Sequence, residues 1–107
     1  MRFKVIIGDQ VYAVEIPEAL LHEAEEFHAK LDRDMDRGWQ MSRAFVAQPD
    51  RLQRCQIVAD KLLTSITQDN QATAMLMASY IALRMPGAIG VTIDVDGEMQ
   101  NTELLYA

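Results

Sequence analysis

The stretch "QATAMLMASYIALRMPGAIGVTIDV", residues 71–95, holds the helix and the strand that decide the fold. Residues 71–85 read as a helix with apolar side chains on every side, and Arg84 is its only charged residue. The breaker Pro86-Gly87 then ends this helix, and residues 89–95 alternate as a strand. A helix that is apolar all round is either buried on all sides or covered by a partner. The sequence therefore predicts that this helix is enclosed.

The chain begins with a predicted β-hairpin followed by a long helix. Residues 3–16, "FKVIIGDQVYAVEI", form two short strands around Gly8-Asp9, a pair typical of tight hairpin turns. Pro17 suits the first position of a helix, which we expect to run to about Arg37. Its predicted core face is an apolar stripe made of Leu20, Ala24, Phe27, Leu31 and Met35.

A second amphipathic helix and a second hairpin complete the predicted elements. The helix, "RLQRCQIVADKLLTSI" at residues 51–66, has Asp50 as its N-cap and follows an irregular connection at residues 39–49. Its apolar stripe consists of Leu52, Cys55, Ala59, Leu62, Leu63 and Ile66. After residues 89–95, "EMQNTELLY" at 98–106 returns as an edge strand. This order predicts an α+β fold: an N-terminal β-hairpin, three helices and a C-terminal β-hairpin, with the helices on one face of a small, mostly antiparallel sheet.

Length and charge restrict the possible functions. With 107 residues the chain is expected to be a single domain, 1–107. Its net charge of −6 disfavours nucleic acid and anionic membranes as partners. The N-terminal apolar run stops at Gly8, which is too short for a signal peptide, and a single cysteine fits a reducing compartment. We therefore expect a cytoplasmic protein.

The stretch "HEAEEFHAKLDRDMDRGW", residues 22–39, contains both histidines and a candidate metal site. Helical spacing puts four side chains on one flank of the first helix: Glu25, His28, Asp32 and Asp36. An E-x-x-H step supplies ligands in di-iron bundles, but those sites need a second such step, which this chain lacks. His28 is also a candidate general base, oriented by Glu25 or Asp32.

The alternative interpretation of this flank is a solvated, salt-bridged helix surface. The opposite charges at Glu26, Lys30 and Asp34 have the spacing of stabilising helical pairs. Because this flank lies outside the predicted core stripe, we expect Glu25 and His28 to be exposed, and we expect their joint replacement by Ala to change the free energy of unfolding by less than about 1 kcal/mol. This is the interpretation that the sequence favours.

Apolar residues outside the predicted core indicate self-association. Ile57 lies opposite the apolar stripe of its helix, and the connection at residues 39–49 carries several apolar side chains. Together with the enclosed helix, these residues give more apolar surface than one small core can bury. A homo-oligomer would bury the remaining apolar surface between subunits. The predicted interface residues are Trp39, Ile57, Met77, Ile81 and Met85.

Part of the chain resembles the ZapA-type cell-division proteins, small bacterial factors that bind the tubulin-like division protein and oligomerise. The resemblance covers Val5 to Leu63 and is carried by "IIGDQVYAVEI", "ALLHEAEEFHAKLDRDM" and "RLQRCQIVADKLL". It implies a partner-binding, self-assembling protein. That family continues into a long coiled-coil helix, whereas this chain breaks at Pro86-Gly87 and ends in predicted strands.

The sequence contains no catalytic or cofactor motif of high specificity, so we expect no cofactor. The function it indicates is a non-catalytic protein–protein interaction or assembly protein that binds itself and another protein. The alternatives are a small metal-binding protein or enzyme that uses the flank of the first helix, and a ZapA-like accessory factor.

Overall fold

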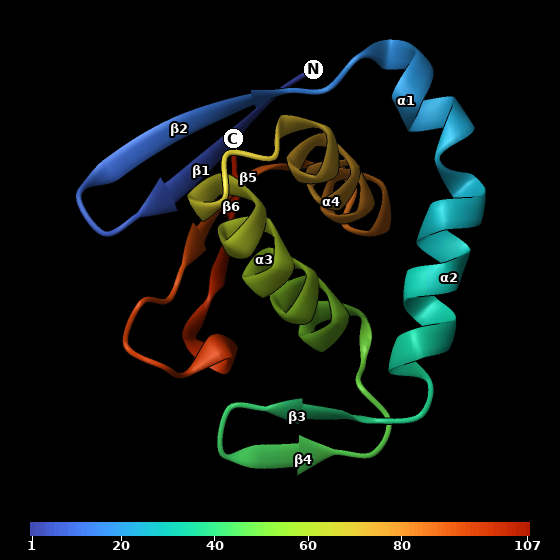
Figure 1. Cartoon of the computed structure of the whole chain (residues 1–107), viewed down its shortest axis with the longest axis vertical. Coiled ribbons are helices and arrows are strands. Elements are labelled where there is room, and N and C mark those ends of the chain that lie inside the picture. Colours follow the sequence, from blue (N-terminus) through green and yellow to red (C-terminus); the bar gives the residue numbers. More distant parts are fainter.

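The computed structural model describes the whole chain, residues 1–107, and has an α+β fold, as predicted (Figure 1). Its strands and helices follow one another as β1 (Arg2–Ile7), β2 (Gln10–Glu15), α1 (Glu18–Glu23), α2 (Glu25–Met35), β3 (Trp39–Met41), β4 (Ala44–Val46), α3 (Arg51–Thr67), α4 (Gln71–Arg84), β5 (Ala88–Ile93) and β6 (Glu103–Tyr106). A short 3₁₀ turn, Met99–Asn101, lies between β5 and β6. None of the helices combines the length and apolar character needed to cross a lipid bilayer.

The two predicted hairpins join into one sheet with the strand order β2-β1-β5-β6. The outer pairings, β1 with β2 and β5 with β6, are antiparallel, and the central pairing of β1 with β5 is parallel. The two central strands approach so closely at Gly90 that a Cβ there would collide with the backbone oxygen of Lys4. Glycine is therefore required at this position.

The helices cover one face of this sheet, as predicted. Along β1, Phe3 and Val5 are buried, whereas Arg2 and Lys4 are exposed on the opposite face. Helix α4 contacts β2 and β5 on one side and α1 on another, and His28 of α2 bonds to its Ser79. Figure 1 shows α4 between the sheet and the arm formed by α1 and α2. The other helices and strands of the same chain therefore cover much of α4, the helix whose apolar side chains lie on every side.

The first predicted helix is interrupted in the structure. Ala24, with φ −90° and ψ 10°, separates α1 from α2, so the chain has four helices instead of three. No Gly or Pro marks this bend. The bend turns the chain around α4, and it lets Leu20 on α1 and Leu31 on α2 both pack against the core. Tertiary packing thus overrides a continuous helical pattern.

The connection at residues 39–49 is not irregular but contains a second, two-stranded sheet. Strands β3 and β4 pair Trp39 with Val46 and Met41 with Ala44. Ser42 adopts a positive φ of 59° in the turn between them, a conformation that is uncommon for serine. Met41 is completely buried and attaches this hairpin to the core. The sequence lacks the Asn-Gly or Asp-Gly pair that would have indicated the turn.

Helices α3 and α4 begin where the sequence predicts. The Asp50 carboxylate accepts a hydrogen bond from the backbone N–H of Gln53 at 2.8 Å, and the Gln53 side chain accepts one from the N–H of Asp50 at 3.0 Å. This reciprocal pair is a capping box. At the start of α4, the Asn70 side chain accepts from the N–H of Thr73 at 3.1 Å. In the predicted stripe of α3, Cys55, Ala59 and Leu62 are buried, Leu63 and Ile66 are partly buried, and the first residue, Leu52, is 44% exposed.

Leu62 and Leu52 lie on the same stripe of α3 but differ in burial, so the two residues can be compared in a test of the core. Leu62 is fully buried, so Leu62→Ala should lower the free energy of unfolding by roughly 2–5 kcal/mol because it leaves a cavity. Leu52→Ala removes the same atoms from an exposed position and should cost less than about 1 kcal/mol. Urea unfolding monitored by circular dichroism measures both values. Equal costs for the two variants would contradict the observed register of α3.

Candidate functional site

The most strongly bonded polar group of the protein is the carboxylate of Asp32, which lies between three helices. Asp32 on α2 accepts a hydrogen bond from the Tyr80 hydroxyl of α4 at 2.5 Å. Its other oxygen accepts from Nη2 of Arg84 at 2.8 Å, and Nη1 of Arg54 on α3 lies 3.2 Å from the first oxygen. A second bond from Arg54 reaches Asp36 at 2.7 Å. The Asp32 cluster (Asp32, Asp36, Arg54, Tyr80 and Arg84) thus links α2, α3 and α4.

These contacts change the pKa values of the cluster. Burial by itself would raise the pKa of Asp32, but hydrogen bonds from Tyr80, Arg84 and Arg54 outweigh burial and hold that pKa below its usual value of 3.8. Burial and the Asp32 charge raise the pKa of Tyr80. Because the folded-state pKa of Asp32 is lowered, its stabilising contribution is present above pH 3.8 and is lost as the pH falls below that value.

His28 is buried beside this cluster and has a fixed hydrogen-bond partner. Its Nε2 lies 2.8 Å from the hydroxyl oxygen of Ser79, and that hydroxyl lies 2.7 Å from the backbone oxygen of Leu76. Since Ser79 has one proton and donates it to Leu76, Nε2 of His28 must be the donor to Ser79. Burial, assisted by the positive charge of Arg84, lowers the pKa of His28. The imidazole therefore acts as a neutral connector between α2 and α4.

The structure does not arrange the predicted metal ligands as a metal site. No group of three or more His, Cys, Asp or Glu side chains is placed to hold an ion. Glu25 is exposed, His28 faces Ser79, and both Asp32 and Asp36 bond to Arg54. The expected exposure of His28 is wrong, because its side chain is 1% exposed. The expectation that replacing Glu25 and His28 together hardly changes the free energy of unfolding assumed that both residues are exposed, and this does not hold for His28.

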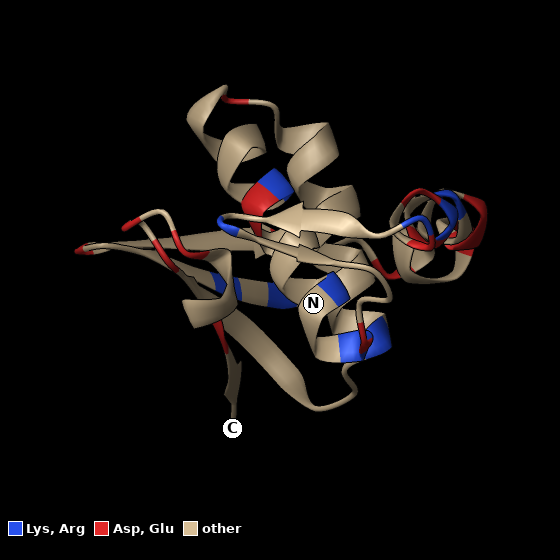
Figure 2. Cartoon of the chain, turned by 90° about the horizontal axis from the view of Figure 1, so that it is seen from below, with Lys and Arg blue, Asp and Glu red and all other residues tan.

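Much of the remaining surface of the arm is charged and exposed, and no ion pair joins Glu26, Lys30 and Asp34. Figure 2 shows acidic and basic residues interleaved on the α1–α2 arm, which is seen end-on at the right of the view. Glu26, Lys30 and Asp34 are exposed there, as the favoured interpretation of this flank expected. Cys55 is buried as predicted, and burial raises the pKa of its thiol to about 12. A thiol with this pKa is protonated near neutral pH and is a poor nucleophile.

Three of the predicted interface residues lie inside the fold. Ile81 is fully buried, Ile57 is 1% exposed and Met77 is 8% exposed, so these side chains are core residues and not a free surface. Besides packing on α4, helix α3 contacts β5 and the 3₁₀ turn Met99–Asn101, so more than one side of α3 is covered. Trp39 and Met85 are half-buried. The ammonium group of Lys61 lies 4.8 Å from the centre of the Trp39 ring.

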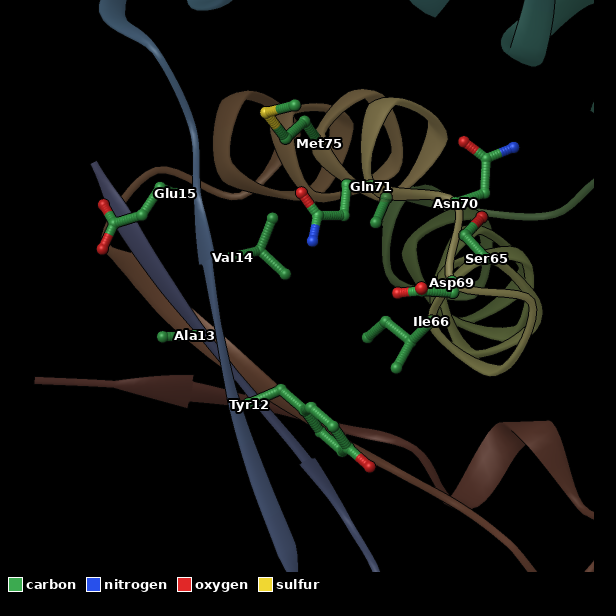
Figure 3. Close-up of a pocket in the computed structure, with 11 residues that line it drawn as sticks. Tyr12, Ala13, Val14, Glu15, Ser65, Ile66, Asp69, Asn70, Gln71 and Met75 are labelled. Carbon is green, nitrogen blue, oxygen red and sulfur yellow. The ribbon is translucent and has the colours of Figure 1, made fainter.

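A groove of about 350 Å³ separates the edge strand β2 from the corner between α3 and α4 (Figure 3). Figure 3 shows Tyr12 and Val14 of β2 pointing toward the helices. Ile66 and Ser65 of α3 and Met75 of α4 line the opposite wall. The helical layer thus leaves part of the inner face of β2 uncovered, and Tyr12 is 40% exposed.

The backbone of β2 is unpaired along the groove. Met1 and Ile16 exchange two hydrogen bonds, of 2.8 and 2.7 Å, and therefore form a hydrogen-bonded pair beside β1 and β2. Such pairs alternate with non-hydrogen-bonded ones in an antiparallel ladder. The residues of β2 whose N–H and C=O groups point away from β1 are consequently Val11, Ala13 and Glu15. No other element bonds to these groups.

The groove was not predicted from the sequence, although part of the signal was present. The pattern of residues 10–16 identifies a strand, but it does not say which strand lies at a sheet edge. The groove also depends on Asp69 and Asn70 of the α3–α4 turn and on Gln71, the first residue of α4. Comparisons with models of known protein families, with curated proteins and with solved structures found no match. The candidate binding site is therefore defined by the geometry of the groove and of the free edge of β2.

We expect Asp32 to be more important for stability than Asp36, although Arg54 bonds to both. Asp32→Asn should lower the free energy of unfolding at pH 7 by about 2 kcal/mol, because it weakens charged hydrogen bonds from three side chains. Asp36 has a 60% exposed side chain, so Asp36→Asn should cost less than about 1 kcal/mol. Chemical denaturation compares the two variants. A larger loss for Asp36→Asn would mean that Asp32 does not hold the three helices together.

The buried His28 should make the protein less stable at mildly acidic pH. Its folded-state pKa is lower than the usual 6.5, so the unfolded chain binds a proton first as the pH falls below 6.5. Stability should therefore fall from pH 6.5 down to the lower, folded-state pKa. His28→Gln should remove this loss, whereas His22→Gln at an exposed position should retain it. Urea midpoints measured at several pH values between 7 and 5 test this, and a wild-type midpoint that stays constant would contradict it.

Proposed function

We propose that this protein is a non-catalytic, cytoplasmic protein–protein interaction protein whose binding surface is the free edge of β2 with its adjacent groove. The observation that supports this proposal is the row of unpaired N–H and C=O groups at Val11, Ala13 and Glu15 next to an open apolar groove. A sheet edge of this kind can pair with an extended segment of another chain. Backbone pairing supplies affinity, and the groove supplies selectivity.

The edge of β2 lacks the features by which sheet edges usually avoid pairing. Proteins protect such edges with short strands, bulges, lysine or proline, or with a covering element. Strand β2 has six residues, none of them Lys or Pro, and its register with β1 has no bulge. At the opposite edge, β6 has four residues and pairs with β5 through an irregular register. An unprotected edge on only one side of the sheet fits a binding role for β2.

Self-association is a second proposed property, supported by the uncovered face of the sheet. Val11 on this face is 64% exposed, and its neighbour across the strands, Ile6, is partly exposed. Leu105 on β6 lies on the same face. A second copy packed against this face would bury these side chains. We therefore propose the outer sheet face for a homo-oligomer, in place of Ile57, Met77 and Ile81.

Site-specific photo-cross-linking in the native cells tests the binding role of β2. Benzoylphenylalanine at Tyr12 should form adducts with another protein, because this side chain lies at the groove. The matched control replaces Tyr106, an exposed tyrosine on the opposite edge strand, and should give few adducts. A product of twice the chain mass from position 12 alone would instead indicate that a second copy occupies the groove. No adduct from position 12 would contradict the proposal.

A further inference from the structure

We infer that the groove beside β2 takes up an extended segment that carries alternating apolar and basic side chains, which adds to the sheet as a fifth strand. This inference rests on the proposed function and specifies its partner. Two properties of the groove support it, namely the direction in which its side chains and backbone groups point and the sign of its charges.

The arrangement of β2 determines where the side chains of an added strand point. Backbone pairing with Val11, Ala13 and Glu15 places every second side chain of the added strand on the same face as Tyr12 and Val14. These inward side chains enter the space opposite Ile66 and Met75. That space is bordered by apolar atoms from both walls, so the inward positions suit aliphatic residues. The outward positions lie beside Val11, Ala13 and Glu15 on the uncovered face.

The charges of the groove select basic residues. Glu15 and Asp69 are its only charged lining residues, and no Lys or Arg lines it. Figure 3 shows Asp69 pointing toward β2 from the α3–α4 turn, and its carboxylate has no ion pair or hydrogen bond. Glu15 pairs with Arg2 but remains 63% exposed. Glu15 favours Lys or Arg at the outward position opposite it, and Asp69 and the net charge of −6 make the surroundings of the groove negative.

The same charges disfavour a second copy of this chain in the groove. Two β2 strands paired antiparallel around Ala13 would place Glu15 of each copy opposite Val11 of the other, so the acidic groups of the groove would meet no basic residue. An acidic edge is therefore better matched by a basic segment than by a copy of itself. The uncovered sheet face proposed for self-association carries Arg2 and Lys4 as well as Glu15, and therefore lacks this one-sided charge.

Fluorescence anisotropy with a designed probe tests the inference. The probe is a fluorescein-labelled hexapeptide of alternating lysine and valine, so either strand direction presents valines to one face and lysines to the other. We expect saturable binding to the full-length protein at about 0.15 M salt, where diffuse charge attraction is screened. A peptide with glutamate in place of every lysine should not bind. Failure of the lysine–valine probe to bind would overturn the inference.

Two variants of equal charge distinguish the groove from general electrostatic attraction. Glu15→Lys should weaken probe binding by at least about fivefold, because it replaces an attraction across the strands by a repulsion. Glu103→Lys makes the same charge change on β6, at the other edge of the sheet, and should change binding by less than about twofold. Equal effects of the two substitutions would overturn the inference.

A backbone variant tests strand addition itself. Ala13→Pro removes one outward N–H from an edge position where proline is tolerated, and should weaken probe binding by about tenfold or more. If thermal unfolding shows that Ala13→Pro does not fold, Gln71→Trp fills the groove from α4 and should weaken binding by at least about fivefold, since it leaves the β2 backbone intact. Unchanged probe binding by a folded Ala13→Pro or Gln71→Trp protein would overturn the inference.

The outcomes separate this inference from the broader proposed function. If position 12 cross-links to another protein but the probe does not bind, the groove binds a partner of different chemistry and only the inference fails. If light scattering shows a dimer that Ala13→Pro abolishes, a second copy occupies the edge and the inference also fails. Absence of both cross-links and probe binding contradicts the proposed function and the inference together.

Discussion

The fold depends on one constraint, which is that α4 has almost no polar face to present to water. Its apolar circumference has to be covered from several directions, and the chain does this with the sheet on one side and with α1, α2 and α3 on the others. The few polar groups on α4 are used as connections: Ser79 bonds to His28, and Tyr80 and Arg84 bond to Asp32. The helices pack over the centre of the sheet. The edge strand β2 is therefore only partly covered.

The Asp32 cluster fixes one part of this arrangement, because its bonds reach three helices that are distant in sequence. A carboxylate removed from water is costly unless its oxygens are bonded, and here Tyr80, Arg54 and Arg84 all donate to it. The same bonds occupy the lone pairs that a metal ion would need. Residues that resemble a ligand set in the sequence are therefore used to hold helices together.

The elements with strong local signals could be predicted, and those that depend on tertiary packing could not. Asp50 caps α3 as expected, and α4 begins at the predicted residue 71, because capping uses residues only three positions apart. The burial of His28 and Ile57 was missed because a helical wheel describes one helix, whereas α4 covers the face that contains His28. The bend at Ala24 has no breaker residue. For the candidate site, the strand β2 was predicted but not its edge position or the groove, since both depend on the order of strands in the sheet.

The parallel pairing of β1 with β5 has a consequence for the way the chain folds. It pairs Lys4 with Gly90, so the centre of the sheet consists of a contact between segments that are far apart in the sequence. Contacts of this kind slow folding, because a long loop has to close before they form. Until β5 arrives, the N-terminal hairpin has two unpaired edges instead of one, and α4 lacks the part of its covering that β5 provides. A nascent chain that stops before Ala88 would therefore expose unpaired strand edges and an apolar helix at the same time. Chaperones recognise both of these features.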